Sequence, residues 1–483
     1  MFSSSVAPLS FLLLTPYSPV LFIDNDDVQA RCLTNSFYGI YGGQSVFKLT
    51  DPSCLSVESF GTLEGGSLLP LSENTHQLVW VQESAVDDAL RTPDYEEEVY
   101  TFLKFLNTES LPINAALHGS GQEFMSSKPG VELLHSSASS ALLAVDPDSA
   151  QTIDTILPRF WKSAILPASP VSYLPVPAPA IDHIKGLLST LKFDPVIAST
   201  VNSLSISQMR SDIRFLTNED GRSGIVTRHS FASGSRVAAD WLLERFEETG
   251  ATCELKSFLV GFAPNVICRY PSTTETTSTV LISGHYDSRG SFGSQRAPGG
   301  NDDGSGTIAL LNIARAIAKT GITFRSNVEL VAFAGEEQGL LGSKAYAREM
   351  RNQDANITLM IQADMLGYHA PGEPAQLGLP QSIGTPEVAE LVSKVSGIYS
   401  PELTIGYSPA CCSDHQSFYE LGYPSTQVFE RAGPIADPMY HNSGDVSDRV
   451  GYDLHQIRSI AKVQFATLLH AAGFDLPEYE NLQ

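Results

Sequence analysis

Three short stretches of the sequence each place histidine, aspartate or glutamate side chains where they could form one site. Each stretch contains an apolar run or a Gly-rich turn at a point where a strand is expected to end: Val280–Ser288, Ala297–Gly306 and Val331–Gly339. Open α/β sheets carry their chemistry on loops at the carboxyl ends of strands. Imidazole nitrogen and carboxylate oxygen are zinc ligands, and a hydrolytic zinc site keeps one position for water. The three stretches therefore predict a hydrolytic metal site.

The spacing within these stretches indicates separate roles. His285 with Asp287 two residues later suits a ligand and the carboxylate that orients its second ring nitrogen. Asp302 lies in a turn made permissive by glycines. Glu336 and Glu337 are adjacent, so one can bind a metal while the other faces a bound water as a base.

Each pattern alone has a plainer explanation. A His-x-Asp is common in surface loops, a Glu-Glu pair on solvated faces, and an Asp-Asp in turns or helix caps. Two later segments favour the metal site. Leu359–Met365 is an apolar strand that carries Asp364 at its end, and Pro438–Asp445 supplies His441 in a turn. Two histidines and several strand-end acids are the ligand set of a two-zinc hydrolase.

The order of these motifs resembles one known family. GHYDS, APGGNDDGSG, AGEEQGLLGS, QADM and YHNSGD follow one another as in the M28 zinc metallopeptidases, in particular the secreted fungal and bacterial leucine-type aminopeptidases. The resemblance covers roughly Val201 to Phe474. It implies the zinc exopeptidase fold, two Zn²⁺ ions per chain and peptide substrates with a free N-terminus.

The resemblance also implies a role for each site residue. Asp302 matches the carboxylate that bridges both zincs, with a cis peptide bond to Asp303. The remaining ligands are His285 and Asp364 for one ion, and Glu337 and His441 for the other. Glu336 matches the general base, and Asp287 the acid behind His285.

The implied reaction is removal of the N-terminal residue of a peptide. Met365 and Phe429 match apolar pocket positions of the family, and Tyr440 is a nearby candidate, although core packing explains each equally well. An apolar pocket gains about 0.8 kcal/mol per buried CH₂ group, which favours Leu over Gly. One departure concerns the bacterial Cys-x-Tyr-x-Cys stretch, where this chain has Ser408 and Ala410 at the first Cys and the Tyr positions.

Three other functions remain open. A glutaminyl-cyclase-like relative shares the fold but uses one zinc, and a non-catalytic scaffold on this fold would lack ligands or the base. A carboxypeptidase would need a cation for the substrate carboxylate, and the motif regions offer Arg289 and Arg431. The complete ligand set favours the aminopeptidase.

Composition excludes some partners. The chain has 483 residues, with 30 Lys and Arg against 54 Asp and Glu, and a net charge of −24. Nucleic acids and anionic membranes bind basic patches, so neither is expected as a partner. No stretch of the sequence reads as a membrane span.

The N-terminal stretch has two interpretations. Residues 1–23 carry no charged side chain, so they are either a secretory signal peptide or a buried strand. Among the six cysteines, Cys32 with Cys54 and Cys253 with Cys268 are either local disulfides or buried thiols. Together with a glycosylation sequon at Asn356, these features predict a secreted protein.

Composition and periodicity divide the rest of the chain into three parts. Residues 24–166 show the order β-α-β-β-α-β and predict a small ferredoxin-like α+β module, either a pro-region that assists folding or inhibits the enzyme, or a permanent accessory module. Residues 167–181 form a Pro-rich linker, open to processing. In residues 182–483 strands and helices alternate, which predicts an α/β domain: a mostly parallel mixed sheet with helices on both faces.

Overall fold

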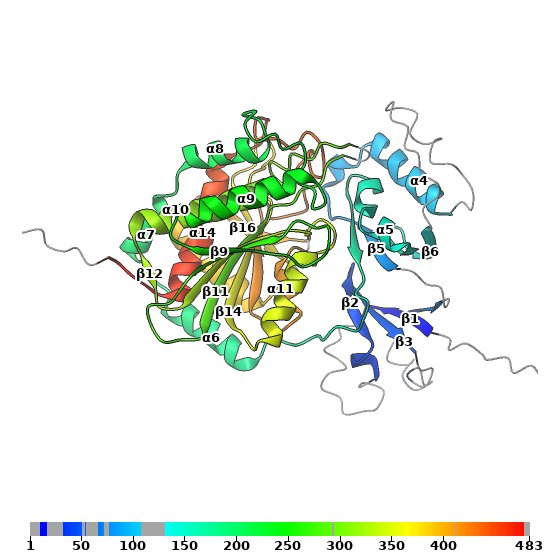
Figure 1. Cartoon of the computed structure of the whole chain (residues 1–483), viewed down its shortest axis with the longest axis horizontal. Helices are drawn as coiled ribbons and strands as arrows, with labels where there is room; N and C mark the ends of the chain where they lie inside the picture. The colour runs from blue at the N-terminus through cyan, green and yellow to red at the C-terminus, as the bar shows by residue number, and fades with distance from the viewer. Residues whose placement is uncertain are drawn as a thin grey trace, which may run out of the picture. The chain divides into compact units, whose positions relative to one another are not determined.

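The computed structural model describes residues 10–16, 32–50, 54, 66–71, 77–107, 131–291, 294–410 and 412–477. The chain forms two compact units, drawn in Figure 1. Unit 1 comprises Met1–Glu83 and Thr92–Pro175, and unit 2 comprises Ser84–Arg91 and Val176–Gln483. Unit 2 thus includes a short segment of the N-terminal region.

A six-stranded sheet forms the centre of unit 2. Its order is β17-β14-β11-β13-β10-β9, with the bounds β17 Ser425–Val428, β14 Asn356–Ala363, β11 Ser278–His285, β13 Asn327–Phe333, β10 Asn265–Tyr270 and β9 Thr252–Lys256. The first four strands are parallel to one another. Strand β10 pairs antiparallel with β13, and β9 pairs antiparallel with β10. This is the mostly parallel mixed sheet expected from the sequence.

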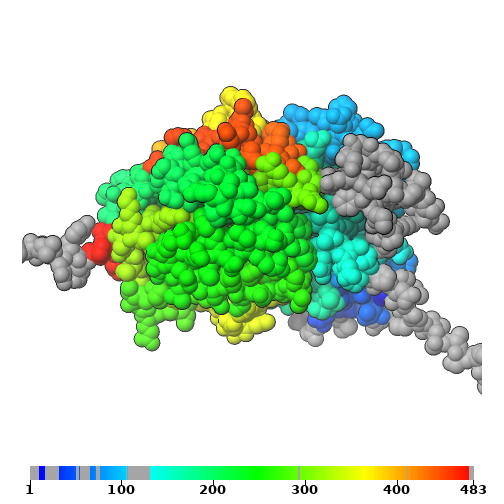
Figure 2. Space-filling model, turned by 45° about the horizontal axis from the view of Figure 1, so that its top comes forward, coloured from blue at the N-terminus to red at the C-terminus, as the bar shows by residue number. Residues whose placement is uncertain are grey.

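Helices cover both faces of this sheet (Figure 1). The longer helices are α6 Ala178–Thr190, α7 Pro195–Asn202, α8 Ile206–Leu216, α9 Ser233–Glu247, α10 Gly304–Thr320, α11 Leu341–Asn352, α12 Pro386–Tyr399 and α14 Leu454–Ala472. One core joins the sheet to α10 and α14, and a second joins its other face to α11 and the short α13, His415–Tyr419. Figure 2 shows the green residues around α9 and β9 spread over one side of unit 2.

Local sequence explains the central elements. The strand β11 is rich in β-branched residues, and Val280 and Ile282 are fully buried. The following helix, α10, begins where the Asp303 side chain accepts the N–H of Gly306, and it ends at Gly321 in the left-handed conformation. These caps determine where the loop before α10 ends and where the helix stops.

Two parts of unit 2 differ from the sequence prediction. The sequence predicts a strand over Cys253–Val260, but β9 stops at Lys256, and the chain then turns so that Phe258 packs against Phe262. Between α11 and α14, β14 was predicted and the other elements were not. They include β15, Gln376–Pro380, and β16, Thr404–Ser408, which pair with each other. A further short pair joins β12, Thr323–Phe324, to β18, Phe474–Asp475.

Unit 1 contains the predicted ferredoxin-like arrangement. Its elements are β5 Gln77–Glu83, α4 Pro93–Asn107, β6 Val131–Ser136, β7 Ser140–Val145, the short helices α5 Pro147–Ala150 and η4 Ile153–Ile156, and β8 Trp161–Ile165. The four strands form an antiparallel sheet in the order β6-β7-β5-β8. The single helix predicted between β7 and β8 is two short helical turns, because Thr152 leaves the helical conformation with φ −121° and ψ 9°. The second turn ends at Leu157, just before Pro158.

A second sheet in unit 1 was not predicted. It has the order β2-β3-β1-β4, with β1 Ser10–Thr15, β2 Phe37–Tyr41, β3 Gln44–Leu49 and β4 Ser67–Leu71. Strand β1 is an inner strand, and Leu12, Leu13 and Leu14 are buried. This is the arrangement expected if the apolar N-terminal stretch is a strand. Residues 1–9 and 17–23 lie outside the described residues, and removal of a leader stays a prediction.

Disulfide bonds join Cys32 to Cys54 and Cys253 to Cys268, as the first of the two interpretations expected. Among the described helices, none combines the length and the apolar composition needed to span a bilayer.

Candidate metal centre

The predicted ligands meet at one edge of the central sheet. Strand β11 ends at His285, and Asp287 follows two residues later. The loop after β13 carries Glu336 and Glu337, and Asp364 directly follows β14. Because β11, β13 and β14 are adjacent and parallel, their carboxyl ends bring these side chains together.

Asp302 lies between the two histidines. Its Oδ1 is 3.3 Å from Nε2 of His285, and its Oδ2 is 3.3 Å from Nε2 of His441. Asp364 Oδ1 lies 3.7 Å from the same His285 nitrogen, and Glu337 Oε2 lies 3.0 Å from Nε2 of His441. The two oxygens of one carboxylate thus face two different imidazoles, each of which has a further acid beside it.

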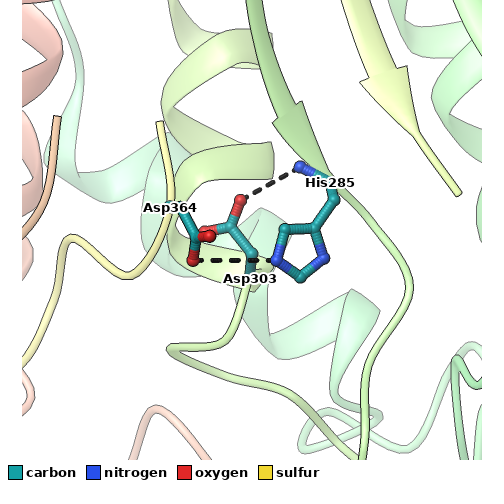
Figure 3. A group of neighbouring side chains, drawn as sticks. All are labelled: His285, Asp303 and Asp364. Atoms are coloured by element: carbon teal, nitrogen blue, oxygen red, sulfur yellow. Dashed lines mark hydrogen bonds and ion pairs between the residues drawn. The ribbon is translucent and has the colours of Figure 1, made fainter. Parts of the chain in front are cut away.

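Asp303 also lies close to His285, but it faces backbone groups. Figure 3 shows Asp303 directed at the backbone nitrogen of His285, while the imidazole faces Asp364. The oxygens of Asp303 accept the N–H groups of His285 at 3.1 Å, Gly306 at 2.8 Å and Met365 at 3.0 Å. Asp303 therefore holds the backbone around the site, although its proximity would allow a grouping with His285 and Asp364. The peptide bond between Asp302 and Asp303 is cis, as the resemblance implied.

The site has the donor chemistry that a metal ion needs. Two groups of side chains have ligand atoms within 4.8 Å of one another, and one of them is Asp302, Glu337 and His441. Both ring nitrogens of His285 and Oε1 of Glu337 are buried, and no described residue forms a hydrogen bond with them. Buried polar atoms of this kind are costly unless a partner satisfies them, and a cation bound among the carboxylates would do so.

A family model agrees with this geometry. The model described as Peptidase family M28 matches residues 265–467, the part of the chain from β10 to α14 that contains every candidate ligand. This part of the chain is an M28 peptidase domain. The chain is accordingly a hydrolase of the metallopeptidase class.

Curated relatives of the M28 domain carry one activity in their names. Leucine aminopeptidase 1 of Metarhizium robertsii is 29% identical over 53% of this chain and 68% of that protein. Leucine aminopeptidase 1 of Trichoderma harzianum is 31% identical, over 47% of this chain and 61% of its own length. The alignments therefore span about half of this chain and up to about two thirds of the relatives.

Solved structures share the fold of unit 2 and of part of unit 1. The LapA aminopeptidase of Legionella pneumophila superposes with a TM-score of 0.60 at 16% identity and covers 83% of this chain and 99% of that chain. LapB of the same organism gives a TM-score of 0.57 at 16% identity, covering 82% and 100%. These shares exceed the part of the chain that unit 2 contributes, so the similarity of fold extends into unit 1.

Asp287 of the M28 domain orients its neighbours. Its Oδ1 lies 3.4 Å from Nδ1 of His285 and accepts the backbone N–H of Glu336 at 3.3 Å. Its Oδ2 accepts the N–H of Glu337 at 3.2 Å and the hydroxyl of Ser230 at 3.1 Å. The position behind His285 is the one that the sequence predicted, whereas the contribution of Ser230 was not anticipated.

Burial and neighbouring charges shift the ionisation of the site. Burial raises the pKa of Glu336 well above its ordinary value, and the carboxylates of Asp364 and Glu337 add to this rise while His285 opposes it. Burial also acts to raise the pKa of Asp302, but its contacts with His285 and His441 leave that pKa below the ordinary value. The site thus combines an easily ionised carboxylate between the histidines with a more basic one at Glu336.

Two groups around the Asp302 loop were missed by sequence reasoning. Asp445 accepts the backbone N–H groups of Asn301 and Asp302 at 3.0 Å, and its own backbone carbonyl accepts the N–H of Gly300 at 2.7 Å. Asp445 belongs to the YHNSGD motif, so its position in that motif was an available signal. Arg449 in turn donates to Asp445 at 3.0 Å.

Arg228 is the second missed group. It is completely buried, and within the described part of the chain its guanidinium donates only to backbone carbonyl oxygens, namely those of Tyr286, Leu216, Pro298 and Gly299. Gly299 has a φ of 55°, and a Cβ at this position would lie 2.8 Å from Nη2 of Arg228. Arg228 therefore connects the loop before Asp302 to Tyr286, the residue that follows His285. A single arginine in the run VTRHSF gave no local signal for this role.

The three predicted pocket residues are all buried next to the metal site. Met365 follows Asp364, Phe429 follows β17, and the ring of Tyr440 stacks on that of His441 at 3.8 Å between centroids. Their contact with a substrate side chain stays a prediction. At the departure from the bacterial pattern, Ser408 donates its hydroxyl to the Gly433 carbonyl at 2.6 Å. The nearby Cys411 lies outside the described residues.

Proposed function

We propose that this protein is a two-zinc aminopeptidase that removes apolar residues such as leucine from the N-terminus of peptides. The position of Asp302 carries the proposal, because its two oxygens lie at equal distances of 3.3 Å from His285 and His441. A carboxylate shared in this way suits a pair of ions. The names of the curated relatives support the same activity.

Each ion would have its own set of ligands. His285, Asp302 and Asp364 would hold one, and Asp302, Glu337 and His441 the other. When bound, a zinc pair would acidify a shared water and polarise the scissile carbonyl. The side chains of Asp287, Asp303 and Asp445 keep these ligands oriented through the hydrogen bonds described above.

Glu336 would act as the general base. Its Oε2 lies 4.0 Å from Nε2 of His285, so it borders the ligands while remaining outside the closest contacts. Burial raises the pKa of this carboxyl, which makes it a better proton acceptor. The carboxylate would take a proton from the attacking water and pass it to the nitrogen of the leaving amine.

The substrate's free amine would supply the exopeptidase specificity. The site carries several buried carboxylates, which favour an ammonium group at the end of the substrate. An internal peptide bond offers no such cation. Met365, Phe429 and Tyr440 would line the pocket for the adjacent apolar side chain. Because the bacterial tyrosine position is Ala410 here, the oxyanion would depend on the metal or on another residue; Tyr407 is largely exposed.

The competing functions are less well supported. Of the two cations considered for a carboxypeptidase, Arg431 is paired with Glu373 at 2.7 Å and with Asp87 at 3.0 Å. Arg289 is buried with Nη1 3.0 Å from Nδ1 of His441. A one-zinc cyclase-like enzyme or a scaffold would leave part of the ligand set without a purpose. Secretion is also part of the proposal, supported by the two disulfides.

A small set of substrates tests the reaction class. Leucine 4-nitroanilide should be hydrolysed in a chelator-sensitive manner, whereas its N-acetylated form should not react and the glycine analogue should react slowly. Equal rates on the free and the acetylated substrate would contradict the aminopeptidase. Cyclisation of an N-terminal glutamine peptide without anilide cleavage would favour the cyclase-like enzyme.

A further inference from the structure

Residues Ser84–Arg91, here called the strap, lie in the sequence of the N-terminal region but belong to unit 2. The strap follows β5 directly, and the chain returns to unit 1 at Thr92, just before α4. It contains one turn of 3-10 helix, Asp88–Leu90, capped by the side chain of Asp87.

Backbone hydrogen bonds attach the strap to unit 2. Val86 pairs with Ile435 in a parallel β-bridge. The N–H of Asp87 donates to the carbonyl of Ile435 at 2.7 Å, and the N–H of Ile435 donates to the carbonyl of Ala85 at 2.8 Å. Val86 and Ile435 are both buried. The strap is therefore paired with the segment that leads from β17 to His441.

An ion pair strengthens this attachment. Nη1 of Arg431 lies 3.0 Å from Oδ2 of Asp87, and the other side of the guanidinium binds both oxygens of Glu373 at 2.7 and 3.1 Å. Nη1 also donates to the carbonyl of Pro434 at 2.8 Å. Arg431 thus connects the strap to two separate segments of the M28 domain.

The first residue of the strap contacts the neighbourhood of the metal site. The hydroxyls of Ser84 and Tyr440 lie 3.1 Å apart, and both side chains are buried. The Tyr440 ring stacks on the imidazole of His441, whose Nε2 faces Asp302 and Glu337. Ser84 is thereby two contacts away from the predicted ligands.

We propose that the strap is a permanent part of the catalytic unit and that Ser84 is a positioning residue for Tyr440, and through it for the pocket that receives the substrate side chain. The inference rests on the proposed aminopeptidase function for its kinetic part only. It favours the permanent accessory module over a pro-region removed at the Pro-rich linker. Cleavage within 167–175 would leave the strap paired with Ile435 and would not raise activity.

Hydrogen exchange on the full chain tests the attachment without reference to activity. Peptides covering residues 84–91 should exchange slowly, at a rate similar to peptides containing Ile435, because the amides of Asp87 and Ile435 are in a bridge. Complete exchange of the strap within seconds, beside a slow Ile435 peptide, would overturn the permanent attachment.

A double-mutant cycle tests the positioning role. Ser84→Ala and Tyr440→Phe each remove one partner of the same hydrogen bond, so each should raise KM for leucine 4-nitroanilide by about 2- to 10-fold with kcat and zinc content little changed. The combined effect in the double variant should be smaller than the sum of the two single effects, because both substitutions remove the same hydrogen bond. The control is Asp88→Ala, on the exposed side of the strap, which should behave as wild type.

The outcomes separate this inference from the proposed function. Additive effects of the two substitutions, or an unchanged KM in Ser84→Ala, would contradict the positioning role. An equal loss of kcat and zinc in Ser84→Ala would also contradict it, since that pattern indicates general disruption of the site. If wild type lacks aminopeptidase activity, the proposed function fails while the exchange experiment still decides the attachment.

Discussion

Oδ2 of Asp287 accepts a hydrogen bond from the backbone N–H of Glu337 at 3.2 Å. The other oxygen of the same carboxylate accepts the N–H of Glu336 at 3.3 Å and lies 3.4 Å from Nδ1 of His285. One buried side chain therefore connects the end of β11 to the loop after β13. Asp287 thus orients His285 and Glu337, which are predicted ligands of different ions, and Glu336, the predicted base.

Asp287→Asn should weaken zinc binding. Each carboxylate oxygen accepts one backbone N–H, so the amide nitrogen replaces an acceptor by N–H donors and the hydrogen bond to Glu336 or to Glu337 is lost. Removing such a partner behind a metal ligand typically lowers metal affinity by about 10- to 100-fold. Titration against a chromogenic chelator measures the affinity. Asp182→Asn on α6 is the matched control, and equal affinity in the two variants would contradict the role of Asp287.

Glu336→Gln should separate chemistry from metal binding. The amide keeps the shape of the side chain but cannot accept the proton of water, so kcat should fall by about 10²- to 10⁴-fold. Zinc per chain should stay at the wild-type value. The surface substitution Glu247→Gln should leave both quantities unchanged. A Glu336→Gln enzyme with more than a tenth of the wild-type kcat would exclude Glu336 as the base.

Arg228→Lys should destabilise unit 2 although the positive charge is kept. An ammonium cannot reach all four carbonyl oxygens that the guanidinium contacts, and each buried carbonyl left without a partner costs about 1–3 kcal/mol. We expect the free energy of unfolding in urea to fall by at least about 2 kcal/mol with zinc in excess. Arg236→Lys, at an exposed arginine that contacts one carbonyl, should change it little. Equal stability of the two variants would contradict this structural role of Arg228.

The ionised carboxylate of Glu219 should stabilise the fold, and this contribution should be lost at acid pH. Burial acts to raise its pKa, but hydrogen bonds from Thr217, Ser447 and Asp448 leave the pKa below the ordinary value of 4.5. A carboxyl with a lowered folded pKa contributes stability above its unfolded pKa and loses it as pH falls through the folded value. The difference in melting temperature between wild type and Glu219→Gln should therefore be constant above pH 5.5 and shrink below pH 4.5. A difference that grows on acidification would contradict this assignment.

The strands around the site follow from local sequence. Val280, Ile282 and Val331 belong to apolar runs that are followed by a histidine or a glutamate, and parallel strands gather such residues at one edge. The same reasoning placed Asp364 at the end of a strand, and in the structure Asp364 directly follows β14. The two central strands of the ferredoxin-like sheet, β5 and β7, were also recognisable from their apolar runs.

Other elements had signals that were overlooked. Strands β2 and β3 are joined by Gly42 and Gly43, both with positive φ, and a Gly-Gly pair between two apolar runs is a hairpin signal. Strand β1 was ambiguous for a physical reason, because a run such as Phe11–Leu14 suits an inner strand and a signal peptide equally well.

Contacts between distant segments could not be read from the chain. Asp302 and Asp303 are chemically identical neighbours, and only the three-dimensional structure shows that Asp303 is used by three backbone N–H groups. Arg228 and Ser84 each lie in a run with no periodic or motif signal, and their partners are far away in sequence. Such residues become visible only when the fold brings them to the site.

The most direct test of the central claim is zinc per chain, measured by elemental analysis on the purified full-length protein with a leucine 4-nitroanilide assay on the same sample. Two zincs per chain, with cleavage lost on chelation and restored by added zinc, is the result expected from a carboxylate shared between His285 and His441. One zinc per chain and no cleavage, even after the Pro-rich linker is cut, would contradict the two-zinc aminopeptidase.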